Sequence, residues 1–104
     1  MSWFGVKLQF VSRVGGRIDA DAIVEESIRV LRATDEADAL RRATELGHAS
    51  SHAYENADGE LVEWVFTRTL EVQDLSEDAI EEGTEVFSTL RRAQPNDLGG
   101  SSTD

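Results

Sequence analysis

The sequence predicts an α+β fold, an antiparallel sheet of four to five strands with one main helix packed on one face. Apolar and polar residues alternate with a period of two from Trp3 to Val14 and again from Leu61 to Val72. Between these segments, the residues from Thr34 onward follow helical spacing instead. A tight-turn dipeptide, Asp58-Gly59, introduces the later of the two alternating segments. The expected order is β-β-α-β-β, and an extra short strand directly after the helix is left open.

The first two strands are expected to form an antiparallel hairpin. The first runs from Trp3 to Val14, and its apolar face consists of Phe4, Val6, Leu8 and Phe10. Glycines at the following turn predict a short connection to a second strand over Ile23 to Ala33. On this second strand we expect one apolar face with Val24, Ile28 and Val30 beside Glu26, and the opposite face with Ile23 and Leu31.

The helix is expected to begin after Thr34 or Asp35, either of which can cap it. Acidic residues in the first turn suit the positive end of the helix dipole. Gly47 is one plausible end, and continuation to about Ala53 is the alternative. The expected buried stripe is Ala37, Leu40, Ala43, Thr44 and Gly47, and the expected charged face is Asp38, Arg41, Arg42 and Glu45.

A long strand is expected from Leu61 to Val72, with Tyr54 to Asn56 as a short partner before the turn. Its expected core face is Val62, Trp64, Phe66, Arg68, Leu70 and Val72, in which Arg68 is the one charged exception.

The last third of the chain is expected to hold smaller elements. One helical turn beginning at Ser76 and a final strand over Thr84 to Arg91 are predicted. We expect residues 1–93 to form a single α+β domain and residues 94–104, which are rich in Gly and Ser, to form a flexible C-terminal tail.

Composition excludes several classes of protein. The 104 residues carry a formal net charge of -11, and basic residues are few and interleaved with acids, which disfavours nucleic acid and anionic membranes as partners. The chain has no cysteine, so disulfides, thiolate metal sites and cysteine nucleophiles are ruled out. No membrane span or export signal is visible, so we expect a cytoplasmic protein. The acidic charge favours a basic protein as a possible partner.

The sheet face away from the helix is expected to carry leftover apolar side chains. They are Trp3, Val11, Ile23 and Leu31, with Leu61 and Val65 as further candidates. Because such a face needs cover, we expect a homo-oligomer, in the simplest case a homodimer formed through this face.

Several blocks resemble a known family. These are Trp3-Phe4-Gly5-Val6-Lys7-Leu8, Glu25-Glu26-Ser27-Ile28, Ala33-Thr34-Asp35-Glu36-Ala37-Asp38-Ala39, His52-Ala53-Tyr54-Glu55-Asn56, Gly59-Glu60 with Trp64-Val65-Phe66, and Gly83-Thr84-Glu85-Val86-Phe87-Ser88. In this order they are similar to the small bacterial proteins grouped as domain of unknown function 4288, over roughly Trp3 to Leu90. The resemblance implies a bacterial stand-alone domain without an assigned activity, and it transfers no catalytic residue.

One candidate metal site emerges from the residues. His48 and His52 are four apart, which would place both imidazoles on one face of a continuing helix, and Glu55 could supply a third ligand. The intervening residues lack the glutamate of the metalloprotease helix motif. The competing interpretation is a pair of surface histidines at the end of the helix.

Carboxylates and polar blocks supply the remaining candidates. Glu26 is expected on an apolar face, where it would need a partner such as Arg68. Five residues are candidates for an interaction surface along one rim: Trp3, Tyr54, Asn56, Trp64 and Glu85. For the polar blocks, turn stabilisation and core packing are the simpler interpretation.

Two functions of different classes follow. The first is a non-enzymatic protein-interaction domain that self-associates through its sheet and needs no cofactor. The alternative is a small metal-dependent or acid-base enzyme centred on His48, His52 and Glu55.

Overall fold

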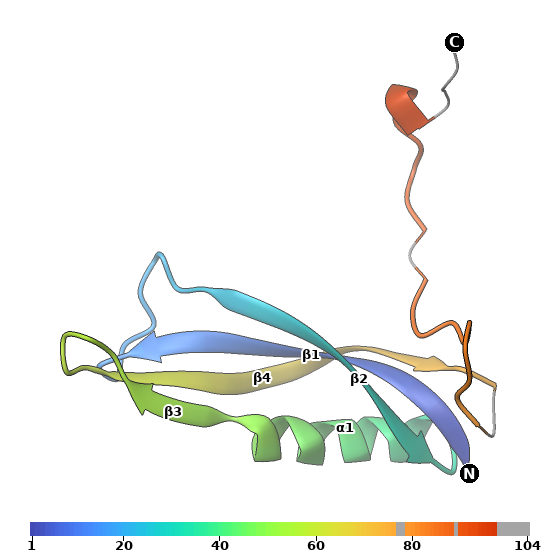
Figure 1. Cartoon of the computed structure of the whole chain (residues 1–104), viewed down its shortest axis with the longest axis horizontal. Coiled ribbons are helices and arrows are strands. Elements are labelled where there is room, and N and C mark those ends of the chain that lie inside the picture. Colours follow the sequence, from blue (N-terminus) through green and yellow to red (C-terminus); the bar gives the residue numbers. More distant parts are fainter. Residues whose placement is uncertain (77–78, 89, 98–104) are drawn as a thin grey trace.

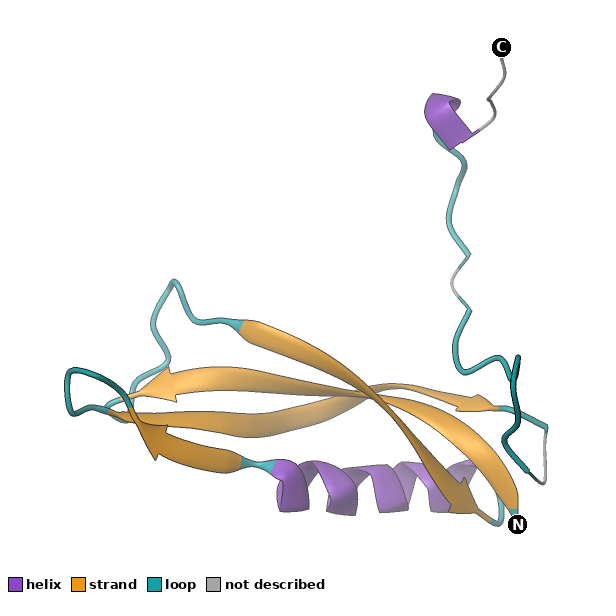
Figure 2. Cartoon of the chain, in the orientation of Figure 1, coloured by secondary structure: helices purple, strands orange, loops and turns teal. Residues whose placement is uncertain are grey.

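A four-stranded antiparallel sheet with one helix on one face forms the fold, as the sequence predicts (Figures 1 and 2). The structure, a computed structural model, describes residues 1–76, 79–88 and 90–97. The chain order is β-β-α-β-β and the strand order across the sheet is β2-β1-β4-β3. The elements are β1 (Ser2–Val14), β2 (Val24–Ala33), α1 (Glu36–Ser50), β3 (His52–Glu55), β4 (Leu61–Asp74) and a 3₁₀ turn, η1 (Pro95–Asp97).

The helix begins where local chemistry provides a cap. Asp35 is the N-cap, and its carboxylate accepts the backbone N–H of Asp38 at 2.8 Å. Asp38 in turn accepts the N–H of Thr34 at 3.0 Å and ion-pairs with Arg41 and Arg42. These contacts confirm the predicted charged face of the helix.

The helix continues through Gly47 and ends at Ser50. Its buried residues are Ala39, Ala43 and Gly47, whereas Leu40 is 49% exposed. The predicted stripe was therefore correct at Ala43 and Gly47 and wrong at Ala37, Leu40 and Thr44, which are exposed. Small side chains on the buried stripe let the helix approach the sheet closely.

The core lies between the helix and one face of the sheet. From β1 it includes the predicted apolar face, Phe4, Val6, Leu8 and Phe10, each no more than 2% exposed. From β4 it includes Phe66, with Trp64 and Val72 packed against it. The helix covers only the half of the sheet near the start of β1, and the two turns at the far end lie beyond it (Figure 1).

The two faces of β2 are opposite to the prediction. Phe4 pairs with Leu31 and Val11 pairs with Val24, and paired residues share a face. Leu31 therefore faces the helix, where it packs against the core, and Val24, Glu26, Ile28 and Val30 lie on the open face of the sheet. Glu26 is exposed, so it needs no buried partner.

Two irregularities in β4 correct the prediction for Arg68. The pairing of β1 with β4 shifts between Lys7 and Leu8 and again between Gln9 and Phe10, so that Leu70 and Thr67 are extra residues on β4. Between the two shifts Arg68 pairs with Gln9 and lies on the open face. The bulges therefore remove the charge that a strict period of two would have put in the core.

Downstream of β4, the described residues contact the open face without forming a strand. Leu75 is buried, and its N–H donates to the carbonyl of Trp3 at 3.0 Å. A Cβ on Gly5 would overlap the carbonyl oxygen of Val86, and Lys7 lies 5.4 Å from the centre of the Phe87 ring. The prediction of a strand over Thr84 to Arg91 was wrong for the described residues of that segment.

Parts of two further predictions fall outside the described residues. The predicted helical turn from Ser76 includes residues 77 and 78, which lie outside them, and Ser76 itself has a left-handed φ of 55°. Of the predicted tail, residues 98–104 lie outside them, and Pro95–Asp97 forms η1. The division into residues 1–93 and 94–104 stays a prediction.

Candidate interaction surface

The open face of the sheet is built of successive rows that run across β2, β1 and β4. One row is apolar and consists of Val24, Val11 and Val65. The next row is polar and consists of Glu26, Gln9 and Arg68. The following row, Ile28, Lys7 and Glu71, combines both kinds of side chain, so this face is mixed in character. The predicted apolar set holds only for Trp3, Val11, Leu61 and Val65.

Charged side chains on the open face pair with one another across strands. Arg13 makes a two-pronged contact with Glu63, with Nε to Oε1 at 2.9 Å and Nη2 to Oε2 at 3.0 Å. The hydrogen bonds from Arg13 lower the pKa of Glu63. Lys7 lies 3.7 Å from Glu71. The contact with Arg13 holds the Glu63 carboxylate ionised, which suits a structural role better than proton donation.

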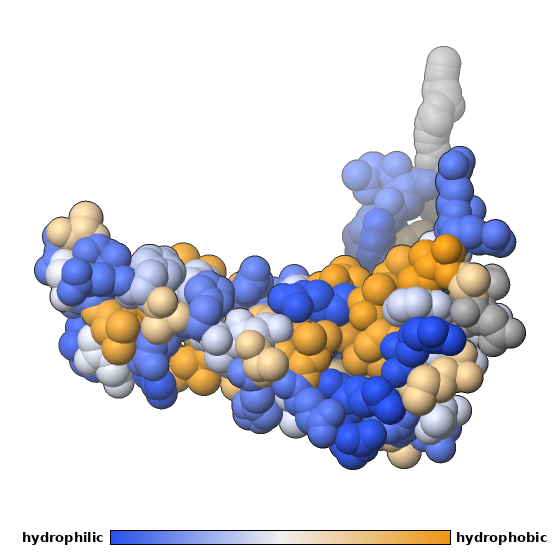
Figure 3. All heavy atoms as spheres, turned by 60° about the horizontal axis from the view of Figure 1, so that its bottom comes forward, coloured by the Kyte–Doolittle hydropathy of each residue, from blue (hydrophilic) through white to orange (hydrophobic). Residues whose placement is uncertain are grey.

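Three exposed apolar side chains lie on β2, one of the two edge strands. Val24 is 53% exposed, Ile28 is 52% exposed and Val30 is 39% exposed. Figure 3 shows the molecule with the bottom of the Figure 1 view turned forward. Further hydrophobic surface lies there, mainly in the half of the molecule from which the C-terminal segment leaves. The β2 side of the sheet is therefore one apolar surface that a partner could cover.

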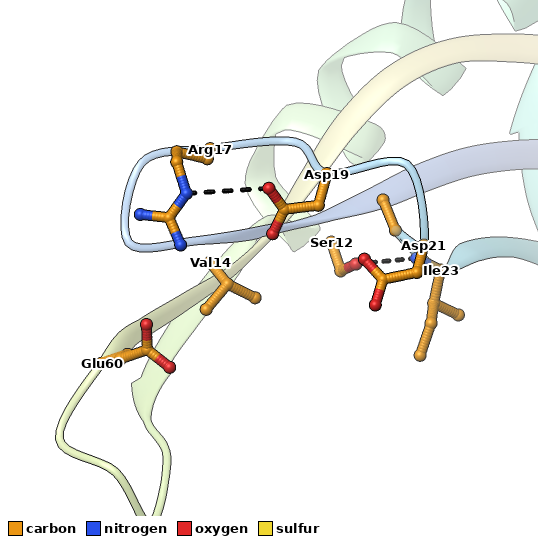
Figure 4. A pocket seen from close by; sticks show the side chains of 8 residues that line it. Ser12, Val14, Arg17, Asp19, Asp21, Ile23 and Glu60 are labelled. Carbon is orange, nitrogen blue, oxygen red and sulfur yellow. Dashed lines mark hydrogen bonds and ion pairs between the residues drawn. The ribbon is translucent and has the colours of Figure 1, made fainter.

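A cavity of about 340 Å³ lies at the far end of the sheet, between the two turns. Figure 4 shows Arg17 directed at Asp19, with Nε 3.6 Å from Oδ1, and Ser12 accepting the N–H of Ile23 at 2.8 Å. Asp21 and Glu60 also line the cavity. In the described part of the chain, no three His, Asp or Glu side chains gather closely enough to hold a metal ion.

The predicted metal ligands are separated by the end of the helix. His48 lies in the last turn of α1, where its ring meets the edge of the Phe66 ring at 5.0 Å between centres. Ser51 is extended, so His52 belongs to β3 and helical spacing does not apply to the pair. On β3, His52 and Glu55 point to opposite faces because they are three residues apart.

The predicted rim residues divide between the two ends of the sheet. Trp3 and the exposed Glu85 lie near the start of β1, since Glu85 precedes the segment that contacts Gly5. Tyr54 and Asn56 lie at the far end, where the Asn56 side chain accepts the N–H groups of Asp58 and Glu60 within the turn. Trp64 packs against the core.

Sequence reasoning singled out Glu26 of β2 but not the distribution of charge along that strand. Glu25 and Glu26 occupy its first half, and Arg29 and Arg32 its second half. Within the described residues none of the four takes part in an ion pair, whereas Arg13, Arg41 and Arg42 all do. In the sequence of β2 the acidic residues precede the basic ones, so the two kinds of charge are separated along the strand.

Within the described ranges, no helix is both long and apolar enough to cross a membrane. The expectations of a cytoplasmic location and of a basic partner stay predictions.

Comparison with known proteins gives one match. The model of a family described as a domain of unknown function, DUF4288, matches residues 3–88. No curated protein and no solved structure matches the chain. Because the match covers most of the sequence, the chain belongs to the DUF4288 family.

Proposed function

We propose that this chain is a small non-enzymatic protein-interaction domain that self-associates through its sheet. The observation that carries the proposal is the exposure of Val24, Ile28 and Val30 on one face of β2, an edge strand, with Glu26 between Val24 and Ile28. Burial of apolar surface of this kind is the main driving force for association, at about 25 cal/mol per Å². A second copy of the chain is the simplest partner that would bury it.

The titratable groups support a non-enzymatic role. The hydrogen bond from the Thr34 backbone and those from Arg41 and Arg42 lower the pKa of Asp38, and Arg13 lowers that of Glu63. Both carboxylates are held in the ionised form by structural partners, whereas a general acid at neutral pH needs a raised pKa.

The test is the mass of the chain in solution. We expect sedimentation at rising micromolar concentrations to give a dimer for the natural chain, and a shift toward the monomer for Ile28→Thr. The matched control is Leu40→Thr, because Leu40 is exposed to nearly the same extent, 49% against 52%, but lies on the helix and not on the sheet. A monomer at all concentrations, or equal effects of the two substitutions, would contradict the proposal.

A further inference from the structure

The outer edge of β2 carries backbone groups that no described residue satisfies. Ser12 donates its N–H to the carbonyl of Ile23 at 2.9 Å, which makes this couple a hydrogen-bonded pair of the β1–β2 ladder. Such pairs alternate with non-hydrogen-bonded ones in an antiparallel ladder. Odd-numbered residues of β2 therefore bond to β1, and the N–H and C=O groups of the even-numbered ones point outward: Val24, Glu26, Ile28, Val30 and Arg32.

The outward backbone groups and the exposed apolar side chains belong to the same residues. Val24, Ile28 and Val30 have backbones that can accept a further strand and side chains that would lie beside those of that strand. An uncovered edge of ten residues is a template for pairing with another chain. The partner that suits this edge is accordingly an extended strand with some apolar side chains.

The charges of β2 identify that strand as β2 of a second copy. Antiparallel pairing about a two-fold axis sets the first half of one strand against the second half of the other. In that arrangement Glu25 of the acidic half can lie opposite Arg29 of the basic half, whereas Glu26 and Arg32 do not lie opposite each other in the same register. Opposite charges across a pair of strands are favourable, and like charges directly opposite each other are unfavourable.

We propose that two copies of this chain join their β2 edges in antiparallel fashion about a two-fold axis at Ser27, so that two four-stranded sheets become one sheet of eight strands. The proposal rests on the self-association proposed above and names its surface. In this register Glu25 lies opposite Arg29 of the second copy, twice by symmetry, and Val24 lies opposite Val30.

Neighbouring registers are less favourable. An axis at Arg29 would pair Glu26 with Arg32 but would put Arg29 directly opposite itself, and an axis at Ile28 would put Glu25 opposite Leu31. The Arg29 guanidinium is already held beside the axis, because Nε donates to Ser27 Oγ at 2.8 Å and Nη1 donates to Ser50 Oγ at 3.3 Å. An axis at Ser27 also leaves Ala33 and the start of the helix outside the paired segment.

The first test is disulfide crosslinking, which is clean because the chain has no cysteine. A residue on the axis faces its own copy at a Cα separation of about 4.5 Å, which a disulfide can span. We expect Ser27→Cys to form a covalent dimer under mild oxidation and Thr44→Cys, on the exposed side of the helix, to stay monomeric. Crosslinking through Ile28→Cys or Arg29→Cys but not Ser27→Cys would overturn the register.

The second test exchanges the charges. Glu25→Arg and Arg29→Glu each create like charges at the paired positions, so we expect each to raise the dimer dissociation constant about tenfold. An equal mixture of the two variants restores opposite charges at both positions, and we expect it to dimerise as tightly as the natural chain. Absence of this rescue would overturn the proposal.

The outcomes separate this inference from the proposed function. If the natural chain is a dimer but neither the Ser27→Cys crosslink nor the rescue by mixing occurs, the β2 edge is not the interface, and self-association through another part of the sheet stands. If the natural chain is a monomer, both proposals fail, and the charges of β2 serve to keep its edge apart from other strands.

Discussion

Gly47 and Phe66 are in such close contact that a Cβ on Gly47 would overlap the atoms of the Phe66 ring. The glycine lies in the last turn of α1 and the ring lies in the middle of β4, so the helix and the sheet are in close contact here. The close packing of the helix on the sheet therefore requires glycine at this position, although glycine has a lower helix propensity than other residues.

Gly47→Ala is expected to destabilise the fold. Alanine gains about 1 kcal/mol in helix propensity, but displacement of a core ring costs about 1–3 kcal/mol. We expect a net loss of about 1 kcal/mol in the free energy of unfolding, measured by urea titration. Thr44→Ala, on the exposed side of the same helix, is the control and should cause no loss. A more stable Gly47→Ala protein would contradict the close packing.

Two threonines of β4 give a matched pair of substitutions. The Thr69 hydroxyl is buried and has no hydrogen-bond partner in the described part of the chain, whereas Thr67 Oγ1 lies 3.1 Å from the carbonyl of Gln9 and 2.9 Å from its side-chain oxygen. We expect Thr69→Val to stabilise the protein by about 1 kcal/mol and Thr67→Val to destabilise it by about 1 kcal/mol or less. If urea titration gave the same change in the free energy of unfolding for both variants, the two hydroxyl groups would not differ in hydrogen bonding as described.

Asp38 is expected to make stability depend on pH in the acid range. Its pKa in the folded chain is lowered, chiefly by the backbone N–H of Thr34 and the Arg41 side chain. The ionised carboxylate therefore contributes in full above the ordinary pKa of about 3.9, and the contribution is lost as the pH falls through the lower folded pKa.

The corresponding measurement is the free energy of unfolding against pH for the natural chain and Asp38→Asn. We expect the two curves to differ most near neutral pH and to converge in acid, because protonation removes the same charge as the substitution. Glu36→Gln, in the same helical turn, is the control. A constant difference down to strongly acid pH would contradict the role of the Asp38 charge.

Gly5→Ala is expected to release the segment around Val86 from the sheet without unfolding it. The new methyl group would overlap the Val86 carbonyl, and the exposed segment can move away at lower cost than β1. We expect faster cleavage after Glu85 by a glutamate-specific protease, while circular dichroism of the sheet stays unchanged. Thr44→Ala is the control, because Thr44 is exposed on the helix, which lies on the other face of the sheet.

Zinc is expected to produce no heat above the buffer control in isothermal titration. His52 and Glu55 lie on opposite faces of β3, and His48 belongs to the helix, so the three groups do not converge. Heat that disappears in the His48→Ala, His52→Ala double variant would contradict this expectation and revive the metal-dependent alternative.

The sequence predicted correctly those elements whose pattern of apolar and polar residues fits only one orientation or one type of secondary structure. β1 has apolar residues on one face only at its centre, and the helix has both a cap at Asp35 and a clear change of period. β2 has apolar residues on both faces, so its alternation fits either orientation. Only the pairing of Leu31 with Phe4, a tertiary fact, decides which face meets the helix.

The bulges of β4 and the charges of the candidate surface could not be interpreted from the sequence alone. Nothing in the run from Thr67 to Leu70 indicates that two residues drop out of the ladder, so Arg68 could be flagged as anomalous but not placed. The charges of β2 were readable, yet their meaning depends on β2 being an edge strand, which is a property of the whole sheet. Strand order is set by long-range contacts that local patterns do not encode.

The helix covers only part of the strands, so local unfolding is expected to differ between the two ends of the sheet. Near the start of β1 the sheet is packed against α1, whereas at the far end all four residues of β3 are exposed and the turns carry little buried apolar surface. Amide hydrogen exchange should therefore vary along a single strand, slow at Val6 and fast at Arg13. The far end should open and close many times for each global unfolding event, so that one continuous ladder behaves as two cooperative units.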